Sequence, residues 1–124
     1  MPRPRILICD DEEGVRESLR LILEERYDVD VAEGGAEAVA HVAQQPYQLL
    51  FLDIKMPQMD GLETLKRVRK LAPTMPVVIL TAYQSMDIAK QTLKLGANDY
   101  LSKPFDRAQI LDAVKQLLAC EKVQ

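Results

Sequence analysis

The sequence predicts an α/β fold in which five consecutive βα units form one parallel sheet between two layers of helices. Apolar runs of strand length alternate with segments of helical periodicity from one end of the chain to the other. Three of these runs are almost wholly apolar, as expected of parallel strands that helices cover on both faces. The chain has 124 residues, of which 48% are hydrophobic, so we expect one domain spanning residues 1–124.

The strands and three of the helices follow from the spacing of their apolar residues. The strands are expected at Arg5–Cys9, Val29–Ala32, Leu49–Leu52, Val77–Leu80 and Asp99–Leu101, of which the first, third and fourth are the apolar runs. The first helix presents Val15, Leu19, Ile22 and Leu23, the second Ala36, Val39, Ala40 and Ala43, and the fifth Ile110, Val114, Leu117 and Leu118.

The two remaining helices are bounded by turn signals. The third is expected at about 62–71, between the Asp60-Gly61 turn and Pro73. The fourth is expected at about 85–95 and carries two competing apolar stripes, Met86/Ala89/Leu93 and Ile88/Thr92/Leu95. The fourth helix is therefore the least firmly specified.

Composition and charge argue against several classes of function. The net charge is −3 and the 16 basic residues are scattered, so the chain has no basic patch for nucleic acid or an anionic membrane. Its first residues, MPRPRILICDDE, contain too short an apolar run for a signal peptide or a membrane span, and we expect a cytoplasmic protein. Cys9 and Cys120 lie far apart and the only histidine is His41, which disfavours a thiolate metal site.

Chemically useful residues follow four of the five strands. Asp10 and Asp11 follow the first, Asp53 the third, Thr81 the fourth and Lys103 the fifth. In sheets built from βα units, ligands bind beyond the carboxyl ends of the strands. We therefore expect these side chains to form one site.

Three crowded carboxylates repel one another unless a cation offsets their charge. Oxygen ligands without histidine or thiolate favour Mg²⁺. With Mg²⁺ and Lys103 the local charge is close to zero, so the site can receive a dianionic phosphoryl group. Asp53 is the candidate nucleophile, and the Thr81 hydroxyl can donate to a phosphoryl oxygen.

Three of these residues also have a structural explanation. Asp10 and Glu13 have the spacing of a capping box for the first helix. Thr81 could simply end a strand, and Lys103 could be a solvated charge before a turn proline. The placement of all of them at strand ends of one fold favours the functional interpretation.

Four segments, ICDDE, LLFLDIKMPQMDG, VVILTAY and GANDYLSKPF, occur in this order over nearly the whole chain. Together they resemble the receiver domain of bacterial two-component response regulators. Within that family, the segment from Thr81 to Phe105 favours a resemblance to the receivers of nitrogen-regulator-type activators. The resemblance implies a flavodoxin-like, doubly wound five-stranded parallel sheet of strand order 2-1-3-4-5.

The resemblance also assigns roles to residues at the site. It makes Asp53 the phosphoacceptor and Asp10 and Asp11 the acidic metal pair. The metal, Mg²⁺, would also bind Asp53 and the main-chain carbonyl of Lys55.

Other implied roles concern the phosphoryl group and switching. Thr81 and Lys103 would contact phosphoryl oxygens, and Tyr100 would be an aromatic switch residue that turns inward when Thr81 moves. A cis Lys103-Pro104 peptide would aim the lysine into the site. Without the resemblance, Tyr100 is an amphipathic tyrosine on a short strand, and X-Pro bonds are usually trans.

The implied function is that of a signalling domain rather than an enzyme with its own substrate. It would be phosphorylated by a sensor histidine kinase, and would catalyse only its own phosphorylation from a donor and its autodephosphorylation. An output domain or effector protein would read the surface formed by the fourth helix, fifth strand and fifth helix. A phosphorylation-dependent dimer is possible on this interpretation.

Three other functions agree less well with the sequence. A haloacid-dehalogenase-like phosphatase also uses an aspartyl nucleophile, but it needs a second aspartate two residues later, where this chain has Lys55. A P-loop nucleotidase needs a G-x-x-x-x-G-K-[ST] motif, which the sequence lacks. A pseudo-receiver that only binds partners would have lost one of the five site residues, and none is lost.

Overall fold

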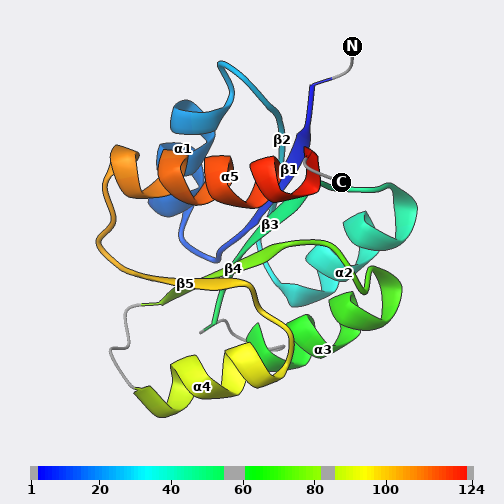
Figure 1. Ribbon diagram of the computed structural model, residues 1–124. Coiled ribbons are helices and arrows are strands. Elements are labelled where there is room, and N and C mark those ends of the chain that lie inside the picture. The colour runs from blue at the N-terminus through cyan, green and yellow to red at the C-terminus, as the bar shows by residue number, and fades with distance from the viewer. Residues whose placement is uncertain (1–2, 55–60, 82–85, 123–124) are drawn as a thin grey trace.

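Five parallel strands form one sheet in the order β2-β1-β3-β4-β5, which confirms the strand order implied by the resemblance. The computed structural model describes residues 3–54, 61–81 and 86–122 (Figure 1). The strands are β1 (Arg5–Cys9), β2 (Asp28–Ala32), β3 (Leu49–Asp53), β4 (Val77–Thr81) and β5 (Asp99–Ser102). Four of them are one residue longer than predicted, and β3 and β4 gain the polar residue that was expected to follow them.

Helices cover both faces of the sheet, as the apolar central strands require. They are α1 (Glu13–Leu23), α2 (Gly35–Gln44), α3 (Gly61–Leu71), α4 (Met86–Lys94) and α5 (Arg107–Lys122). Figure 1 shows α1 and α5 on one face and α2, α3 and α4 on the other. Within the described residues, none of the helices combines the length and apolar character that a membrane span would need.

The core consists of two apolar clusters separated by the sheet. Alternate residues of β3 serve the two sides: Leu50 and Leu52 belong to the cluster under α2 and α3, and Leu49 and Phe51 to the cluster under α1 and α5. Every residue of β3 and β4 is buried. Because burying a large apolar side chain contributes roughly 1.5–3 kcal/mol, the central strands hold the ends of β3 and β4 firmly in place.

The predicted buried stripe of α2 is right for Val39 and wrong for its three alanines. Ala36, Ala40 and Ala43 are exposed, whereas Gly35 and Ala38 are buried and the two valines, Val39 and Val42, pack against the core. Alanines recur at helical spacing on more than one face of this segment, so periodicity alone did not fix which face is buried. A valine buries more apolar area than an alanine, and the helix turns its valines inward.

The described residues of α4 favour the second of its two predicted stripes. Thr92 is fully buried and Leu95, just after the helix, packs against the core, whereas Leu93 is 52% exposed. The helix ends at Lys94, one residue earlier than expected.

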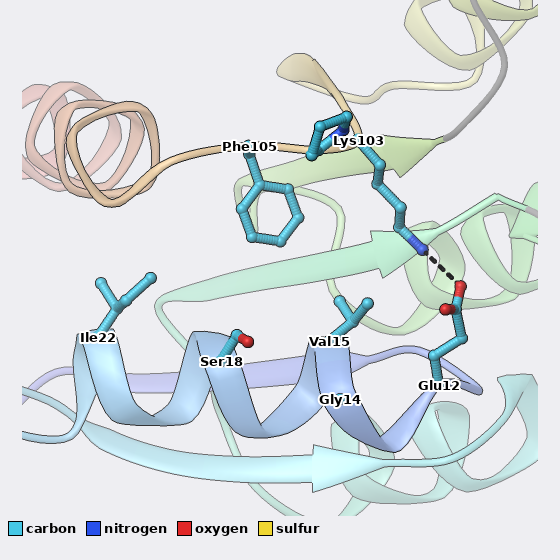
Figure 2. A pocket seen from close by; sticks show the side chains of 8 residues that line it. Glu12, Gly14, Val15, Ser18, Ile22, Lys103 and Phe105 are labelled. Carbon is cyan, nitrogen blue, oxygen red and sulfur yellow. Dashed lines mark hydrogen bonds and ion pairs between the residues drawn. The ribbon is translucent and has the colours of Figure 1, made fainter.

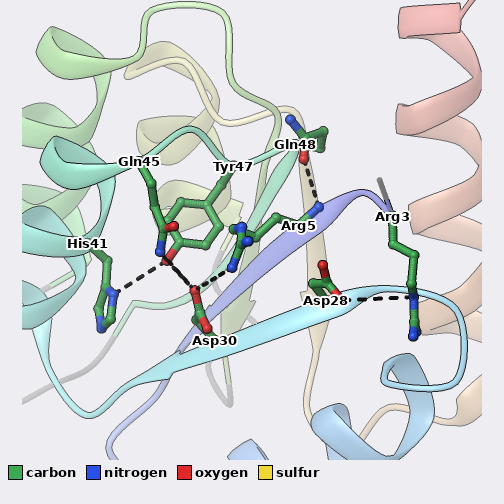
Figure 3. Close-up of polar contacts among 8 residues, drawn as sticks. All are labelled: Arg3, Arg5, Asp28, Asp30, His41, Gln45, Tyr47 and Gln48. Carbon is green, nitrogen blue, oxygen red and sulfur yellow. Dashed lines mark hydrogen bonds and ion pairs between the residues drawn. The ribbon is translucent and has the colours of Figure 1, made fainter. Parts of the chain in front are cut away.

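A polar network holds the edge strand β2 to the segment between α2 and β3 (Figure 3). The Tyr47 hydroxyl donates to Asp30 Oδ2 at 2.6 Å, and Gln45 Nε2 donates to the same oxygen at 3.1 Å. Arg5 Nη1 lies 3.5 Å from that oxygen, and His41 Nδ1 lies 3.4 Å from the Tyr47 hydroxyl. We call Asp30, Gln45, Tyr47, Arg5 and His41 the Asp30 network.

Candidate functional site

The carboxyl ends of three strands meet at the ammonium group of Lys103. Its Nζ lies 2.9 Å from Asp10 Oδ2, 3.5 Å from Asp53 Oδ2 and 3.5 Å from Glu12 Oε1. Asp10 follows β1, Asp53 ends β3 and Lys103 follows β5. Residues from positions 10, 53 and 103 thus lie together because the parallel sheet brings their strand ends to one edge, as the sequence predicted.

The main chain of β4 anchors Lys103. Its backbone N–H donates to the carbonyl of Thr81, the buried last residue of β4, at 2.7 Å. The Lys103-Pro104 peptide is cis, as the resemblance implied. Figure 2 shows the lysine side chain reaching past the start of α1 toward Glu12, beside an open groove that Phe105 and Val15 help to line.

The charge of Lys103 is stabilised by its acidic neighbours. Burial alone would lower the pKa of this ammonium, but the attraction of Asp10, Asp53 and Glu12 outweighs it, and the pKa is raised. Lys103 is therefore a permanent positive charge at the centre of the site.

Asp10 is held by the backbone on both sides and does not cap α1. Its N–H donates to Ala32 O at 3.2 Å, and its Oδ1 accepts a hydrogen bond from the N–H of Glu12 at 2.8 Å. The N-cap position of α1 is Glu12, which makes no side-chain cap, so the capping-box alternative is wrong. The helix begins at Glu13, too late for Asp10 to cap it.

Asp10 carries a buried acceptor whose partner is a single ammonium. Its Oδ2 forms an ion pair with Lys103 Nζ at 2.9 Å, and the described residues offer it no further polar partner. Oxygens of Asp10, Asp11 and Glu12 lie within 4.8 Å of one another. A buried acceptor in a compact group of carboxylates fits a hard divalent cation such as Mg²⁺.

Asp53 is almost fully buried, with 4% of its side chain exposed. The chain returns beside it at Gly61, whose N–H donates to Ile54 O at 2.9 Å. A Cβ at Gly61 would lie 2.4 Å from Ile54 Cα and 2.6 Å from Asp53 O. Only glycine permits this close approach, so Gly61 fixes the backbone on which Asp53 stands.

Two other predicted site residues, Thr81 and Tyr100, lie on the neighbouring strands β4 and β5. Thr81 is buried at the end of β4, next to Ser102 in the register of β4 and β5. Tyr100 is half-buried and packs against the cluster under α2 and α3. The proposed Lys55 carbonyl ligand lies outside the described residues.

Sequence reasoning missed two residues that contact the site. Glu12 adds a third acid next to the predicted pair, and its place directly after Asp11 was a visible signal. Arg16 donates from Nη1 to the Asp10 carbonyl at 2.7 Å. Its spacing from Leu19 and Leu23 puts a charge on the buried stripe of α1, which was the signal for a partnered arginine.

Comparison with known proteins identifies the family. A sequence model of the response regulator receiver domain matches residues 6–115, most of the chain. The chain belongs to the response regulator receiver domain family. As in other two-component systems, this receiver domain is a phosphoacceptor module of a signalling pathway.

Similar proteins include both longer and equally long regulators. The receiver domain is 39% identical over 121 residues to the response regulator MprA of Mycobacterium ulcerans, covering 97% of this chain and 52% of that protein. It is also 39% identical over 119 residues to the sporulation initiation phosphotransferase F of Bacillus subtilis, covering 95% of this chain and 96% of that protein. The chain spans about half the length of several regulators that it matches.

Solved structures share its fold. A CheY-like response regulator receiver domain protein from Methanospirillum hungatei superimposes with a TM-score of 0.92 at 35% identity, covering 98% of this chain and 99% of the other. The Brucella abortus protein NtrX superimposes with a TM-score of 0.90 at 28% identity over 99% of this chain and 28% of its own. The flavodoxin-like fold is therefore confirmed both by the strand order and by these neighbours.

Proposed function

We propose that this receiver domain accepts a phosphoryl group from a sensor histidine kinase on Asp53, with Mg²⁺ bound at the neighbouring acids. The observation that carries the proposal is the position of Lys103 Nζ, 3.5 Å from Asp53 Oδ2 and 2.9 Å from Asp10 Oδ2. A fixed ammonium beside a buried carboxylate can neutralise a phosphoryl group on that carboxylate.

The transfer itself needs little from the protein beyond position and charge. An oxygen of the Asp53 carboxylate forms the new bond to phosphorus while the bond from phosphorus to the donor's histidine nitrogen breaks. The electron pair of that bond stays on the imidazole nitrogen, and the ring leaves as neutral imidazole because its other nitrogen already carries a proton in the donor. Lys103 would balance charge on the transferred oxygens, and the Thr81 hydroxyl would donate to one of them.

The metal ligands that we propose are Asp10, Asp11, Asp53 and the main-chain carbonyl of Lys55. The buried Asp10 carboxylate, which has no polar partner for Oδ2 beyond Lys103 among the described residues, and the acids beside it support the first two. When bound there, Mg²⁺ supplies positive charge to the phosphoryl oxygens. Glu12 lies close enough to replace one ligand or to orient a bound water.

We propose that phosphorylation is transmitted through Thr81 and Tyr100. A shift of the Thr81 hydroxyl toward the phosphoryl group would leave space for the Tyr100 ring, which is half-buried at the neighbouring strand. This would bias the surface of α4, β5 and α5 toward one of two arrangements. An output domain or effector protein would bind that surface, and a dimer formed on phosphorylation would use it too.

Three further proposals complete this function. Residues 1–124 act as one receiver unit in the cytoplasm. The domain catalyses only its own phosphorylation from a donor and its autodephosphorylation. The presence of all five chemical groups, in Asp10, Asp11, Asp53, Thr81 and Lys103, supports an active receiver over one that only binds partners.

Intact mass after incubation with Mg²⁺ and acetyl phosphate tests the phosphoacceptor proposal. We expect wild type to gain one phosphoryl group, and Asp53→Asn or chelator to prevent the gain. Asp112→Asn makes the same change at an exposed site on α5 and should react as wild type does. An undiminished gain in Asp53→Asn would refute the assignment.

A further inference from the structure

Arg16 is a charged residue on the buried face of α1 that contacts the acidic loop from within the fold. Only 11% of its side chain is exposed. Its Nη1 donates to the main-chain carbonyl of Asp10 at 2.7 Å, and its Nη2 lies 3.4 Å from Glu33 Oε1, in the segment between β2 and α2. A buried guanidinium is costly unless it is well paired, so these contacts hold it in one place.

The contact with Asp10 O has a consequence for the next residue. The peptide group is planar, so fixing the direction of the Asp10 carbonyl also fixes the N–H and Cα of Asp11. Asp10 has other restraints, through Ala32 O, the Glu12 N–H and Lys103. Asp11 is exposed, and the direction of its carboxylate depends on the backbone that carries it.

We infer that Arg16 is a positioning residue that sets the Asp11 carboxylate for binding the divalent cation. Its hydrogen bond to Asp10 O orients the 10–11 peptide, and its ion pair with Glu33 holds the guanidinium from the other side. The inference rests on the proposed function only in taking Asp10 and Asp11 as cation ligands. Groups that orient metal ligands typically change metal affinity tenfold or more when they are removed.

A purely structural role makes a different prediction. If Arg16 only stabilised the fold, its loss would lower the free energy of unfolding but leave the Mg²⁺ affinity of the folded molecules unchanged. The dissociation constant of Mg²⁺, measured well below the unfolding temperature, therefore separates positioning from stability.

The test is a Mg²⁺ titration of the unphosphorylated protein, followed by amide chemical shifts. Arg16→Met keeps the length of the buried stem without a donor, and Arg16→Gln is a second neutral variant in case the first does not fold. We expect either to weaken Mg²⁺ binding about tenfold, with the Asp11 amide shifted before any Mg²⁺ is added. Arg16→Lys restores the charge and one donor, and should recover most of the affinity.

Two further variants complete the design. Arg20→Met removes an exposed arginine one turn later on the same helix, which pairs with Glu17 and Glu24, and should bind Mg²⁺ as wild type does. Glu33→Gln leaves the hydrogen bond from Arg16 to Asp10 O in place, so it should weaken Mg²⁺ binding far less than Arg16→Met.

The inference would be overturned if folded Arg16→Met or Arg16→Gln bound Mg²⁺ as tightly as wild type. It would also be overturned if Glu33→Gln lost as much Mg²⁺ affinity as Arg16→Met. No phosphate donor is present in this titration, so a failure of Asp53 to accept phosphate would be seen separately.

Discussion

Two aspartates in this receiver domain, Asp30 and Asp10, have the same side chain and opposite surroundings. Asp30 Oδ2 in the edge strand accepts hydrogen bonds from Tyr47 and Gln45 and lies near Arg5 (Figure 3). Asp10 Oδ2 is fully buried, and among the described residues its polar partner is Lys103, whose Nζ lies 2.9 Å away. The first carboxylate has two neutral donors, whereas the second lies among other acids beside one ammonium that they share.

The difference teaches how stability and function are separated in one sheet. A satisfied buried polar group stabilises the fold, while an unsatisfied or repelling one costs stability and persists where it serves a function. If this is correct, replacing an acid in the Asp30 network and replacing one at the site should change stability in opposite directions.

The largest effect on stability is expected in the Asp30 network. Asp30→Ala leaves the Tyr47 hydroxyl and the Gln45 amide without their acceptor, so we expect the free energy of unfolding to fall by about 2 kcal/mol. Urea unfolding measures this change. Mg²⁺ affinity should stay unchanged, and a Mg²⁺ affinity that falls with stability would break the separation between the two regions.

A smaller effect of opposite sign is expected at the site. Asp53→Asn removes one of the three carboxylates within 3.5 Å of Lys103 Nζ, those of Asp10, Glu12 and Asp53. Asp11 adds a fourth negative charge beside Asp10 and Glu12. Without Mg²⁺ we expect the free energy of unfolding to rise by about 1 kcal/mol, as for other neutralised functional acids. Asp112→Asn on α5 controls for net charge, and a clear loss of stability in Asp53→Asn would show that the acids stabilise the fold.

The smallest effect concerns the response of the Asp30 network to pH. Burial, and then the hydrogen bond to Asp30, raise the pKa of Tyr47 from 10.0 to about 12. Between these values the unfolded chain loses the phenol proton while the folded chain keeps it, so stability is complete below pH 10 and declines above it. As the pH rises from 9 to 11, the free energy of unfolding should fall less in Tyr47→Phe than in wild type. An equal fall in the two proteins would contradict the raised pKa.

The sequence predicted the sheet better than the helices. In β3 and β4 the prediction did not have to decide which face is buried, because helices cover both faces of these apolar strands. In α2, by contrast, small alanines lie on more than one side, and the helix buries Ala38 rather than Ala40. Periodicity cannot decide between faces when the residues differ so little in area.

The sequence predicted the site residues that lie at strand ends. It did not predict the residues whose side chains reach the site from a helix. Asp10, Asp53 and Lys103 meet because strand order and register bring them together, which a topology can predict. Arg16 reaches Asp10 O from the second turn of a helix, and its role depends on the path of the side chain. Strand topology does not specify such a contact.

The central claim is that phosphate is carried by Asp53, the carboxylate at the end of β3. Borohydride treatment of the phosphorylated protein reduces an aspartyl phosphate to homoserine, and peptide mass spectrometry then locates the converted residue. We predict homoserine at position 53 in samples treated with Mg²⁺ and phosphodonor, with Asp10, Asp11 and Asp30 unchanged and with no conversion when Mg²⁺ is chelated. Conversion of Asp10 or Asp11 with Asp53 intact would contradict the account.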